Sequence, residues 1–254
     1  MTERQTKILN LVNINKKIEV SRLSEELGVS QVTIRKDLDI LEEMDLLSRE
    51  HGYAVRKNMD DIGNRLALYY DVKQKIAKAA AETVTNGETI MIESGSSCAL
   101  LAEYLAENRR DITIITNSAF IAKYIRKTAG GVIKVILLGG EYQKEAEVMV
   151  GPLVKTCARE FYVDKLFIGT DGFIPGVGFT SGDMMRSEAM KSMAESANKT
   201  IILTDSSKFH EHGVVLQLRM EAVDTIFTDS KIPNDIKESL EGKGVKVEIA
   251  DETL

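Results

Sequence analysis

Five clusters of glycine or small polar residues in this chain could hydrogen-bond to phosphates and to sugar hydroxyls, through side chains or through the backbone. Each cluster directly follows a short apolar run, as polar loop residues do after a buried strand. Gly95-Ser96-Ser97 offer a glycine, two hydroxyls and the start of a helix, and these groups together form an anion cradle. The candidate ligand-binding residues of the five clusters are Glu93, Gly95, Ser96, Ser97, Asn117, Ser118, Gly139, Gly140, Asp171, Asp205 and Lys208.

The clusters differ in the chemical group that each could bind. A phosphate would fit the Ser96-Ser97 loop, and Lys208, expected at a neighbouring strand end, could supply the counter-charge. The hydroxyls of a sugar would suit Asn117, Asp171 and Asp205. Glycine, serine and aspartate are also ordinary turn and cap residues. An alternative is therefore that Asp205 to Ser207 only cap a helix and that Lys208 is solvated.

An α/β domain with a mostly parallel sheet is the fold that would bring these clusters together. From Asp71 onwards the chain alternates amphipathic helices, beginning with the helix Asp71 to Val84, with short apolar runs. In such sheets ligands bind at the carboxyl ends of the strands, where the clusters lie. The predicted strands are 89–92, 112–115, 135–138, 165–168, 200–203, 225–227 and 245–249.

A second stretch with recognisable chemistry begins at Ser30, in the N-terminal part of the chain. Ser30 suits a helix N-cap, and Ile34, Leu38 and Leu41 recur at helical spacing on one face. A short helix, Ser21 to Leu27, precedes this stretch, and a glycine follows that helix. Helix, glycine turn and helix is the layout of a helix-turn-helix, although an amphipathic helical hairpin would give the same spacings.

The residues after this second helix predict a wing. Leu46 to Glu50 and Tyr53 to Arg56 are strand-like runs on either side of His51-Gly52, which is typical of a hairpin. Basic residues on the helix and on the hairpin would then contact phosphates and base edges. The candidate DNA-binding residues are Ser30, Gln31, Val32, Thr33, Arg35, Lys36, Arg49 and His51.

The chain divides into two domains on this interpretation. Residues 1–57 form the winged helix-turn-helix, with a first helix from Thr2 to Asn13 and a short strand, Lys17 to Val20, that pairs with the wing. Residues 58–70 show no clean periodicity and are predicted to be a hinge. Residues 71–254 form the larger α/β domain. The first domain has too few apolar residues to be robust alone, so we expect self-association through the second.

Composition limits the class of protein. At 43% apolar and 28% charged residues, the chain has the composition of a soluble globular protein. No apolar run could span a bilayer and the first residues do not resemble a signal peptide, so we expect a cytoplasmic protein. Cys98 and Cys157 form no paired motif and there are three histidines, so we expect neither a metal nor a cofactor.

The net charge of −6 is not evenly distributed along the chain. Residues 1–57 carry ten basic and ten acidic residues, which leaves 23 basic and 29 acidic residues for the remainder. The excess of acid therefore lies entirely in the second part. A local positive potential on the helix and wing can steer a protein to DNA without a basic total.

The N-terminal motif resembles the winged helix of the deoxyribose-operon-repressor (DeoR) family of bacterial regulators. The similarity covers about Arg4 to Arg56, and Asp45 and Tyr53 depart from it because the family usually has glycine there. The matching pieces are Leu23, Gly28 to Ser30, Thr33 to Leu38, Leu41-Glu42 and Arg49 to Gly52.

The second part resembles the sensor domain of the same family, which is similar in fold to ribose phosphate isomerase and coenzyme A transferases. The similarity covers about Asp71 to Ala250. Glu93 replaces a usual aspartate and Ser96-Ser97 a usual threonine pair. The resemblance implies an effector site for a phosphorylated sugar or a related metabolite. The matching pieces include Gly95 to Ser97, Asn117-Ser118, Gly139-Gly140, Asp171-Gly172, Glu188 and Asp205 to Phe209.

Three functions remain open at this point. The first is a transcriptional regulator of carbohydrate metabolism, most simply a repressor, which binds operator DNA as a dimer or tetramer and is not an enzyme. The second is a sugar-phosphate isomerase with a helix-turn-helix appendage. Similarity in fold does not decide between a regulator and an enzyme. The third is a redox switch that uses Cys98 and Cys157. The isomerase would use Glu93, Asp171, Glu188, Asp205 and Lys208 as acid, base and stabiliser.

Overall fold

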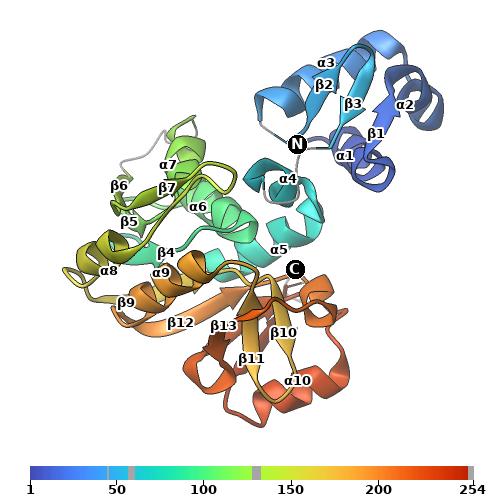
Figure 1. Cartoon of the computed structure of the whole chain (residues 1–254). Helices are drawn as coiled ribbons and strands as arrows, with labels where there is room; N and C mark the ends of the chain where they lie inside the picture. The colour runs from blue at the N-terminus through green and yellow to red at the C-terminus, as the bar shows by residue number, and fades with distance from the viewer. Residues whose placement is uncertain (45, 57–60, 128–132, 251–254) are drawn as a thin grey trace. The chain divides into compact units, whose positions relative to one another are not determined.

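The chain forms two compact units, Met1–Asp71 and Val72–Leu254 (Figure 1). A computed structural model describes residues 1–44, 46–56, 61–127 and 133–250. Each unit contains its own sheet, and each is described separately below.

The first unit is a winged helix-turn-helix, as predicted. Its three strands form an antiparallel sheet in the order β1-β3-β2, so the predicted strand near Lys17 pairs with the wing. Its elements are α1 (Glu3–Asn15), β1 (Lys17–Glu19), α2 (Val20–Leu27), α3 (Gln31–Glu43), β2 (Ser48–Glu50), β3 (Tyr53–Val55) and α4 (Ile62–Ala67).

Local sequence explains the turn between α2 and α3. Gly28 ends α2 in a left-handed conformation with φ of 64°, which glycine adopts without a steric penalty. Ser30 then caps α3, because its hydroxyl accepts a hydrogen bond from the N–H of Thr33 at 3.2 Å. Ile34, Leu38 and Leu41 are fully buried on one face of α3, as their spacing predicts.

The segment predicted as a hinge contains a helix. Residues 57–60 lie outside the described residues, but Asp61 caps α4 by accepting hydrogen bonds from the N–H groups of Gly63 and Asn64. Ile62 and Leu66 are buried. A helix of six residues makes fewer than two turns, which is too short to show a periodic pattern in the sequence.

The second unit is an α/β domain built on a seven-stranded parallel sheet in the order β15-β14-β12-β9-β4-β5-β6. All seven predicted strands are present, with ends that shift by a few residues. They are β4 (Thr89–Ile92), β5 (Thr113–Thr116), β6 (Lys134–Leu137), β9 (Val163–Ile168), β12 (Ala197–Leu203), β14 (Thr225–Thr228) and β15 (Lys246–Ile249).

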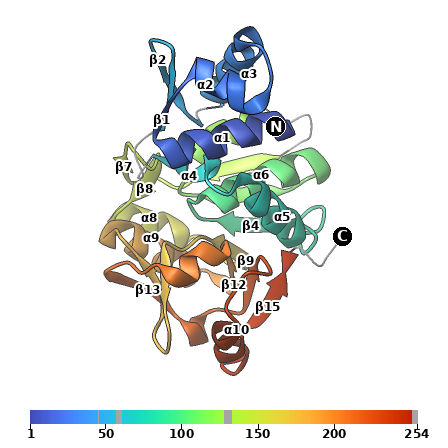
Figure 2. The same cartoon turned by 90° about the vertical axis from the view of Figure 1, so that its right-hand side faces the viewer.

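Helices cover both faces of this sheet (Figure 2). Helices α5 and α6 lie on one face, and α8 and α9 lie on the other. On the second face, side chains of α8, α9 and α10 join Met91, Leu166 and Ile202 of the sheet in one buried cluster. The helices of this unit are α5 (Tyr70–Ala81, which begins at the boundary between the units), α6 (Ser96–Asn108), α7 (Ala119–Tyr124), α8 (Pro152–Ala158), α9 (Met184–Ala194) and α10 (Asn234–Glu241).

Two smaller sheets were not predicted from the sequence. Strands β10 (Gly172–Ile174), β11 (Gly178–Ser181) and β13 (Val215–Arg219) form one antiparallel sheet, and β7 (Glu141–Gln143) and β8 (Val148–Val150) form a hairpin. Runs of three to five residues do not show a reliable alternation, so sequence patterns do not find them.

In the part of the chain that the structure describes, no helix is both long and apolar enough to cross a membrane.

We expect Leu38→Ala to destabilise the first unit by about 2–5 kcal/mol, because truncating a fully buried leucine leaves a cavity in a small core. Urea unfolding of the full chain, followed by circular dichroism, would show this as a lower midpoint for the first unit. Ile14→Ala is the matched control, because Ile14 is 78% exposed on α1. A similar loss in both variants would contradict this packing.

Candidate functional site

The predicted DNA-binding residues of α3 lie on the surface of the first unit. Gln31, Val32, Arg35 and Lys36 are exposed, and Val32 is 60% accessible. Arg35 donates a hydrogen bond from Nη2 to Oε1 of Gln31 at 3.3 Å. The first turns of α3 therefore offer donors, an amide and an apolar side chain on one exposed surface, which is the combination that reads base edges and phosphates.

An ion pair that was not predicted holds the buried side of α3. Asp37 is 4% exposed and accepts a hydrogen bond from Nε of Arg4 at 2.5 Å and another from Nε2 of Gln5 at 3.3 Å. The hydrogen bond with Asp37 raises the pKa of Arg4 above its ordinary value. These contacts fix α3 to α1. Sequence spacing could not reveal them, because Asp37 follows Arg4 by 33 positions in the chain.

The wing is held to its neighbours by two further pairs. The guanidinium of Arg49 forms an ion pair with Asp39 of α3, and the backbone N–H of Arg49 donates to Oε1 of Glu42 at 2.9 Å. Glu50 pairs with Nζ of Lys17 at 2.7 Å, and this hydrogen bond lowers the pKa of Glu50. Arg49 is thus engaged within the protein. Its predicted contact with DNA stays a prediction.

The tip of the wing consists of His51 and Gly52, both exposed and both with positive φ. Tyr53, which departs from the family pattern, begins β3 and pairs with Glu19 and Glu50 across the sheet. Nζ of Lys17 lies 4.9 Å from the centre of its ring. The tyrosine is therefore accommodated in the ladder. Asp45, the other departure, lies outside the described residues.

In the second unit, the loops after β4, β5 and β9 meet at one edge of the sheet. The N–H of Ser94 donates to Oδ1 of Asn117 at 3.2 Å, and a Cβ on Gly95 would lie 3.7 Å from Cα of Gly169. The hydroxyl of Ser94 donates to Glu93 at 2.7 Å. The parallel sheet thus brings together these predicted clusters, as the sequence indicated.

The Ser96-Ser97 loop has free hydrogen-bonding capacity. Both serines are nearly buried at the start of α6, and their hydroxyls have no partner among the described residues. Gly95 precedes the helix without a side-chain cap, so the first N–H groups of α6 point out of its N-terminal end. This arrangement suits a bound anion.

Two other predicted residues have structural roles. Ser118 caps α7, where its hydroxyl accepts a hydrogen bond from the N–H of Ile121 at 3.1 Å. Gly140 lies against β8, and a Cβ there would be 2.6 Å from the carbonyl oxygen of Val150. Gly139 has open space around its Cα. These roles do not prevent the backbone of the same loops from contacting a ligand.

In the loop after β12, the predicted ligand-binding residues Asp205 and Lys208 contact other residues of the same loop. Oδ1 of Asp205 accepts hydrogen bonds from the N–H of Ser207 at 3.2 Å and from its hydroxyl at 2.5 Å, so Asp205 caps a short 3₁₀ helix, Ser206–His210. Nζ of Lys208 pairs with Glu211 at 2.8 Å. The expectation that Lys208 lies at a strand end neighbouring the Ser96-Ser97 loop was wrong, because β9 separates β4 from β12.

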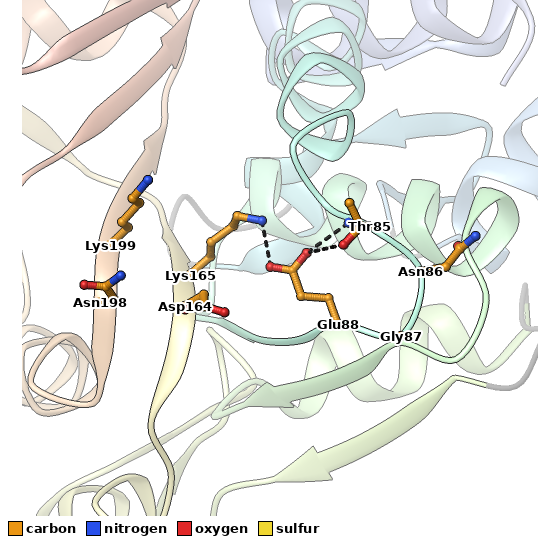
Figure 3. Close-up of a pocket in the computed structure, with 8 residues that line it drawn as sticks. All are labelled: Thr85, Asn86, Gly87, Glu88, Asp164, Lys165, Asn198 and Lys199. Carbon is orange, nitrogen blue, oxygen red and sulfur yellow. Dashed lines mark hydrogen bonds and ion pairs between the residues drawn. The ribbon is translucent and has the colours of Figure 1, made fainter.

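A separate polar cavity lies at the opposite ends of the strands (Figure 3). It has a volume of about 450 Å³ and lies where β4, β9 and β12 begin. Two of its side chains are already paired, because Nζ of Lys165 contacts Glu88 at 2.6 Å and Glu88 accepts from the N–H of Thr85 at 2.9 Å. Its lining residues are Thr85, Asn86, Gly87, Glu88, Asp164, Lys165, Asn198 and Lys199.

Comparison with known families decides among the candidate functions. Residues 4–59 match the DeoR-like helix-turn-helix domain, and residues 69–230 match the DeoR C terminal sensor domain. The chain belongs to the DeoR family of transcriptional regulators. It is therefore a regulator with a DNA-binding helix-turn-helix and a sensor domain for a small molecule.

Several curated proteins are similar over nearly the whole chain. The HTH-type transcriptional regulator GolR of Listeria innocua is 31% identical over 98% of both chains. A putative aga operon transcriptional repressor of Escherichia coli O157:H7 is 28% identical over 97% of this chain and 93% of its own. Both are named as regulators of transcription, which favours this function over an isomerase.

Solved structures add only a partial likeness. A ribose 5-phosphate isomerase from Methanocaldococcus jannaschii is 22% identical over 55% of this chain and 54% of its own, with a TM-score of 0.41.

In the part of this chain that the structure describes, no three histidine, cysteine or acidic side chains form a group that could hold a metal ion. Cys98 is buried in α6 and Cys157 is partly buried in α8.

We expect Asp39→Asn to steepen the salt dependence of DNA binding, because it releases Arg49 to contact a phosphate. One added phosphate contact changes the log–log slope by about 0.9. The measurement is the dissociation constant for a non-specific duplex at several salt concentrations. Glu43→Gln is the matched control, because it removes the same charge from exposed α3 surface without releasing an arginine. Equal slopes in the two variants would contradict a role for Asp39 in holding Arg49.

Proposed function

We propose that this regulator represses a carbohydrate-metabolism operon and that a phosphorylated sugar or a related metabolite is its effector. The observation that carries the proposal is the convergence of polar loops at one edge of the parallel sheet, beside the unpaired hydroxyls of Ser96 and Ser97. The names of relatives support it, since one is called a putative aga operon repressor.

On the DNA side, the proposal assigns base reading to the N-terminal end of α3. Gln31 and Val32 are exposed there, and an amide can pair with adenine while an apolar side chain can contact a thymine methyl group. The remaining contacts would be to phosphates, which fix the position of the protein on the duplex. They are assigned to Ser30, Thr33, Arg35, Lys36, Arg49 and His51.

On the effector side, the phosphate would occupy the N-terminal end of α6. The N–H groups of the first turn and the hydroxyls of Ser96 and Ser97 would donate to its oxygens, and Lys208 would have to leave Glu211 to reach it. The sugar would contact the surrounding loops. The residues assigned to the whole site are Glu93, Gly95, Ser96, Ser97, Asn117, Ser118, Gly139, Gly140, Asp171, Asp205 and Lys208.

The switch requires that the effector favour one arrangement of the two domains. A ligand shifts an equilibrium only by its differential affinity for the two states. We assign the DNA-binding domain to residues 1–57, the hinge to 58–70 and the effector and oligomerisation domain to 71–254. A dimer or tetramer would match an operator with two-fold symmetry.

Replacing Arg35 and Lys36 together by Ala should weaken operator binding severely. If each contacts one phosphate, the log–log salt slope should fall by about two. Binding is measured by fluorescence anisotropy at several salt concentrations. Lys243→Ala with Lys246→Ala removes the same charge from the second unit, where both lysines are paired with glutamates. Unchanged operator binding by the α3 variant would remove this helix from the DNA-binding surface.

Lys208→Met should leave operator binding intact and weaken the response to effector about tenfold or more, the expected cost of a lost charge-assisted hydrogen bond of about 1.5–3 kcal/mol. A thermal-shift screen of sugar phosphates first identifies the effector. Release of operator is then titrated for both proteins.

Lys191→Met is the matched control, because Lys191 also pairs with a glutamate three residues away, Glu188. Operator release at the wild-type effector concentration would show that Lys208 is not a ligand. If the wild type converts the effector to an isomer and Lys208→Met does not, the result would instead support the alternative function, a sugar-phosphate isomerase.

A further inference from the structure

A chain of contacts connects the predicted effector loops to the start of α9. Nδ2 of Asn117 donates to the carbonyl oxygen of Met149 in β8 at 3.0 Å, and β7 of the same hairpin carries Gln143. Nε2 of Gln143 donates to Oδ2 of Asp183, the N-cap of α9, at 3.2 Å. The β7–β8 hairpin therefore links the end of β5 to the first turn of α9.

A second chain of contacts reaches the same aspartate from the end of β9. Oδ2 of Asp171 accepts a hydrogen bond from the hydroxyl of Ser181 at 3.0 Å, and that hydroxyl accepts one from the N–H of Asp183 at 3.2 Å. Asp171 follows Gly169, which packs against Gly95. The two chains close a ring of contacts that contains the carboxyl ends of β4, β5 and β9 and the start of α9.

Arg186 lies on this ring, in the first turn of α9, and the hydrogen-bonding capacity of its side chain is unused. Its side chain is only 16% exposed. Its Nε is buried and forms an ion pair with Oδ2 of Asp183 at 3.7 Å, a distance too long for a hydrogen bond. Among the residues that the structure describes, the guanidinium donates no hydrogen bond to any acceptor. Most buried polar groups are paired, so this one requires an explanation.

The position of Arg186 makes its state more unusual. The first turn of a helix carries the positive end of the helix dipole, where an acidic residue is favoured and a cation is not. The neighbouring acceptors are already engaged, since Asp183 accepts from Gln143 and from the N–H of Arg186, and Asp171 accepts from Ser181 and from the N–H of Gly182. Neither carboxylate accepts a hydrogen bond from the Arg186 side chain, so the donors of that side chain remain available to a ligand.

We propose that Arg186 binds an oxyanion of the effector that is distinct from the phosphate at Ser96 and Ser97. The inference rests on the proposed sugar-phosphate function and narrows it to effectors with two anionic groups. A guanidinium is planar and presents paired N–H groups, a geometry that matches the two oxygens of a carboxylate or a phosphate. An alcohol at the same place would supply a donor as well as an acceptor and would satisfy the arginine less well.

Sugar acids and the corresponding alcohols distinguish this proposal from general binding of sugar phosphates. Titration calorimetry on the full chain would compare 6-phosphogluconate with glucitol 6-phosphate, and ribonate 5-phosphate with ribitol 5-phosphate. We expect the acid of at least one pair to bind tenfold or more tightly than its alcohol. Arg186→Gln should abolish that preference and leave the affinity for the alcohol within twofold of the wild-type value.

Two further variants separate recognition from folding. Arg186→Lys keeps the charge but loses the planar fork, and should show an intermediate preference. Lys191→Gln removes a cation from the same helix, where that cation pairs with Glu188, and should keep the full preference. Thermal unfolding of each variant without ligand checks that the fold is retained.

The outcomes separate the two sources of an oxyanion. If fructose 1,6-bisphosphate binds more tightly than either acid to the wild type and loses this advantage in Arg186→Gln, the result would support the proposal. A second phosphate, in place of a carboxylate, would then be the group that Arg186 binds. Equal binding of acid and alcohol by the wild type, with no such bisphosphate effect, would overturn it. A preference for either anion that survives in Arg186→Gln would also overturn it.

The proposed function can fail separately. If no phosphorylated compound binds but gluconate or ribonate binds in an Arg186-dependent manner, the sugar-phosphate function is wrong and the oxyanion site stands. If none of these compounds binds, the oxyanion site is refuted as well.

Discussion

Parallel pairing across the seven-stranded sheet is the constraint on which the second unit depends. Because all its paired strands run in the same direction, every loop that follows a strand emerges at one edge. The apolar strands and the helices on both faces form the core, so polar side chains are left for the loops. The hydrogen bond between Ser94 and Asn117 and the packing of Gly95 on Gly169 follow from this parallel arrangement of the strands.

In the first unit the corresponding constraint is the anchoring of α3. Its apolar face packs on the core, and Arg4 and Gln5 hold Asp37 from α1. The wing is tied to α3 through Asp39 and Glu42. A surface that reads bases needs such fixed contacts, because base readout depends on small differences in position. The ion pairs between elements therefore serve geometry more than net stability.

The sequence predicted those parts of the molecule that depend on local pattern. The cap at Ser30, the left-handed Gly28 and the seven parallel strands each have a signal within a few residues. The order of the strands in the sheet has no such local signal, and for that reason Lys208 was expected too near the Ser96-Ser97 loop. The contacts of Asp37 and of Asp183 also join residues far apart in the chain. Arg186 did leave a sequence signal, a cation in the first turn of a helix, and it was not recognised.

The proposed function requires that effector binding in the second unit and operator binding in the first be coupled. Coupling is reciprocal, so an effector that weakens operator binding must itself bind the operator complex more weakly, by the same factor. The direct measurement is calorimetric titration of the effector into the free protein and into the protein saturated with operator. We predict a weaker effector affinity for the complex, by about 5–150-fold, the usual range for such coupling. Equal affinity for the free protein and the complex would contradict the account.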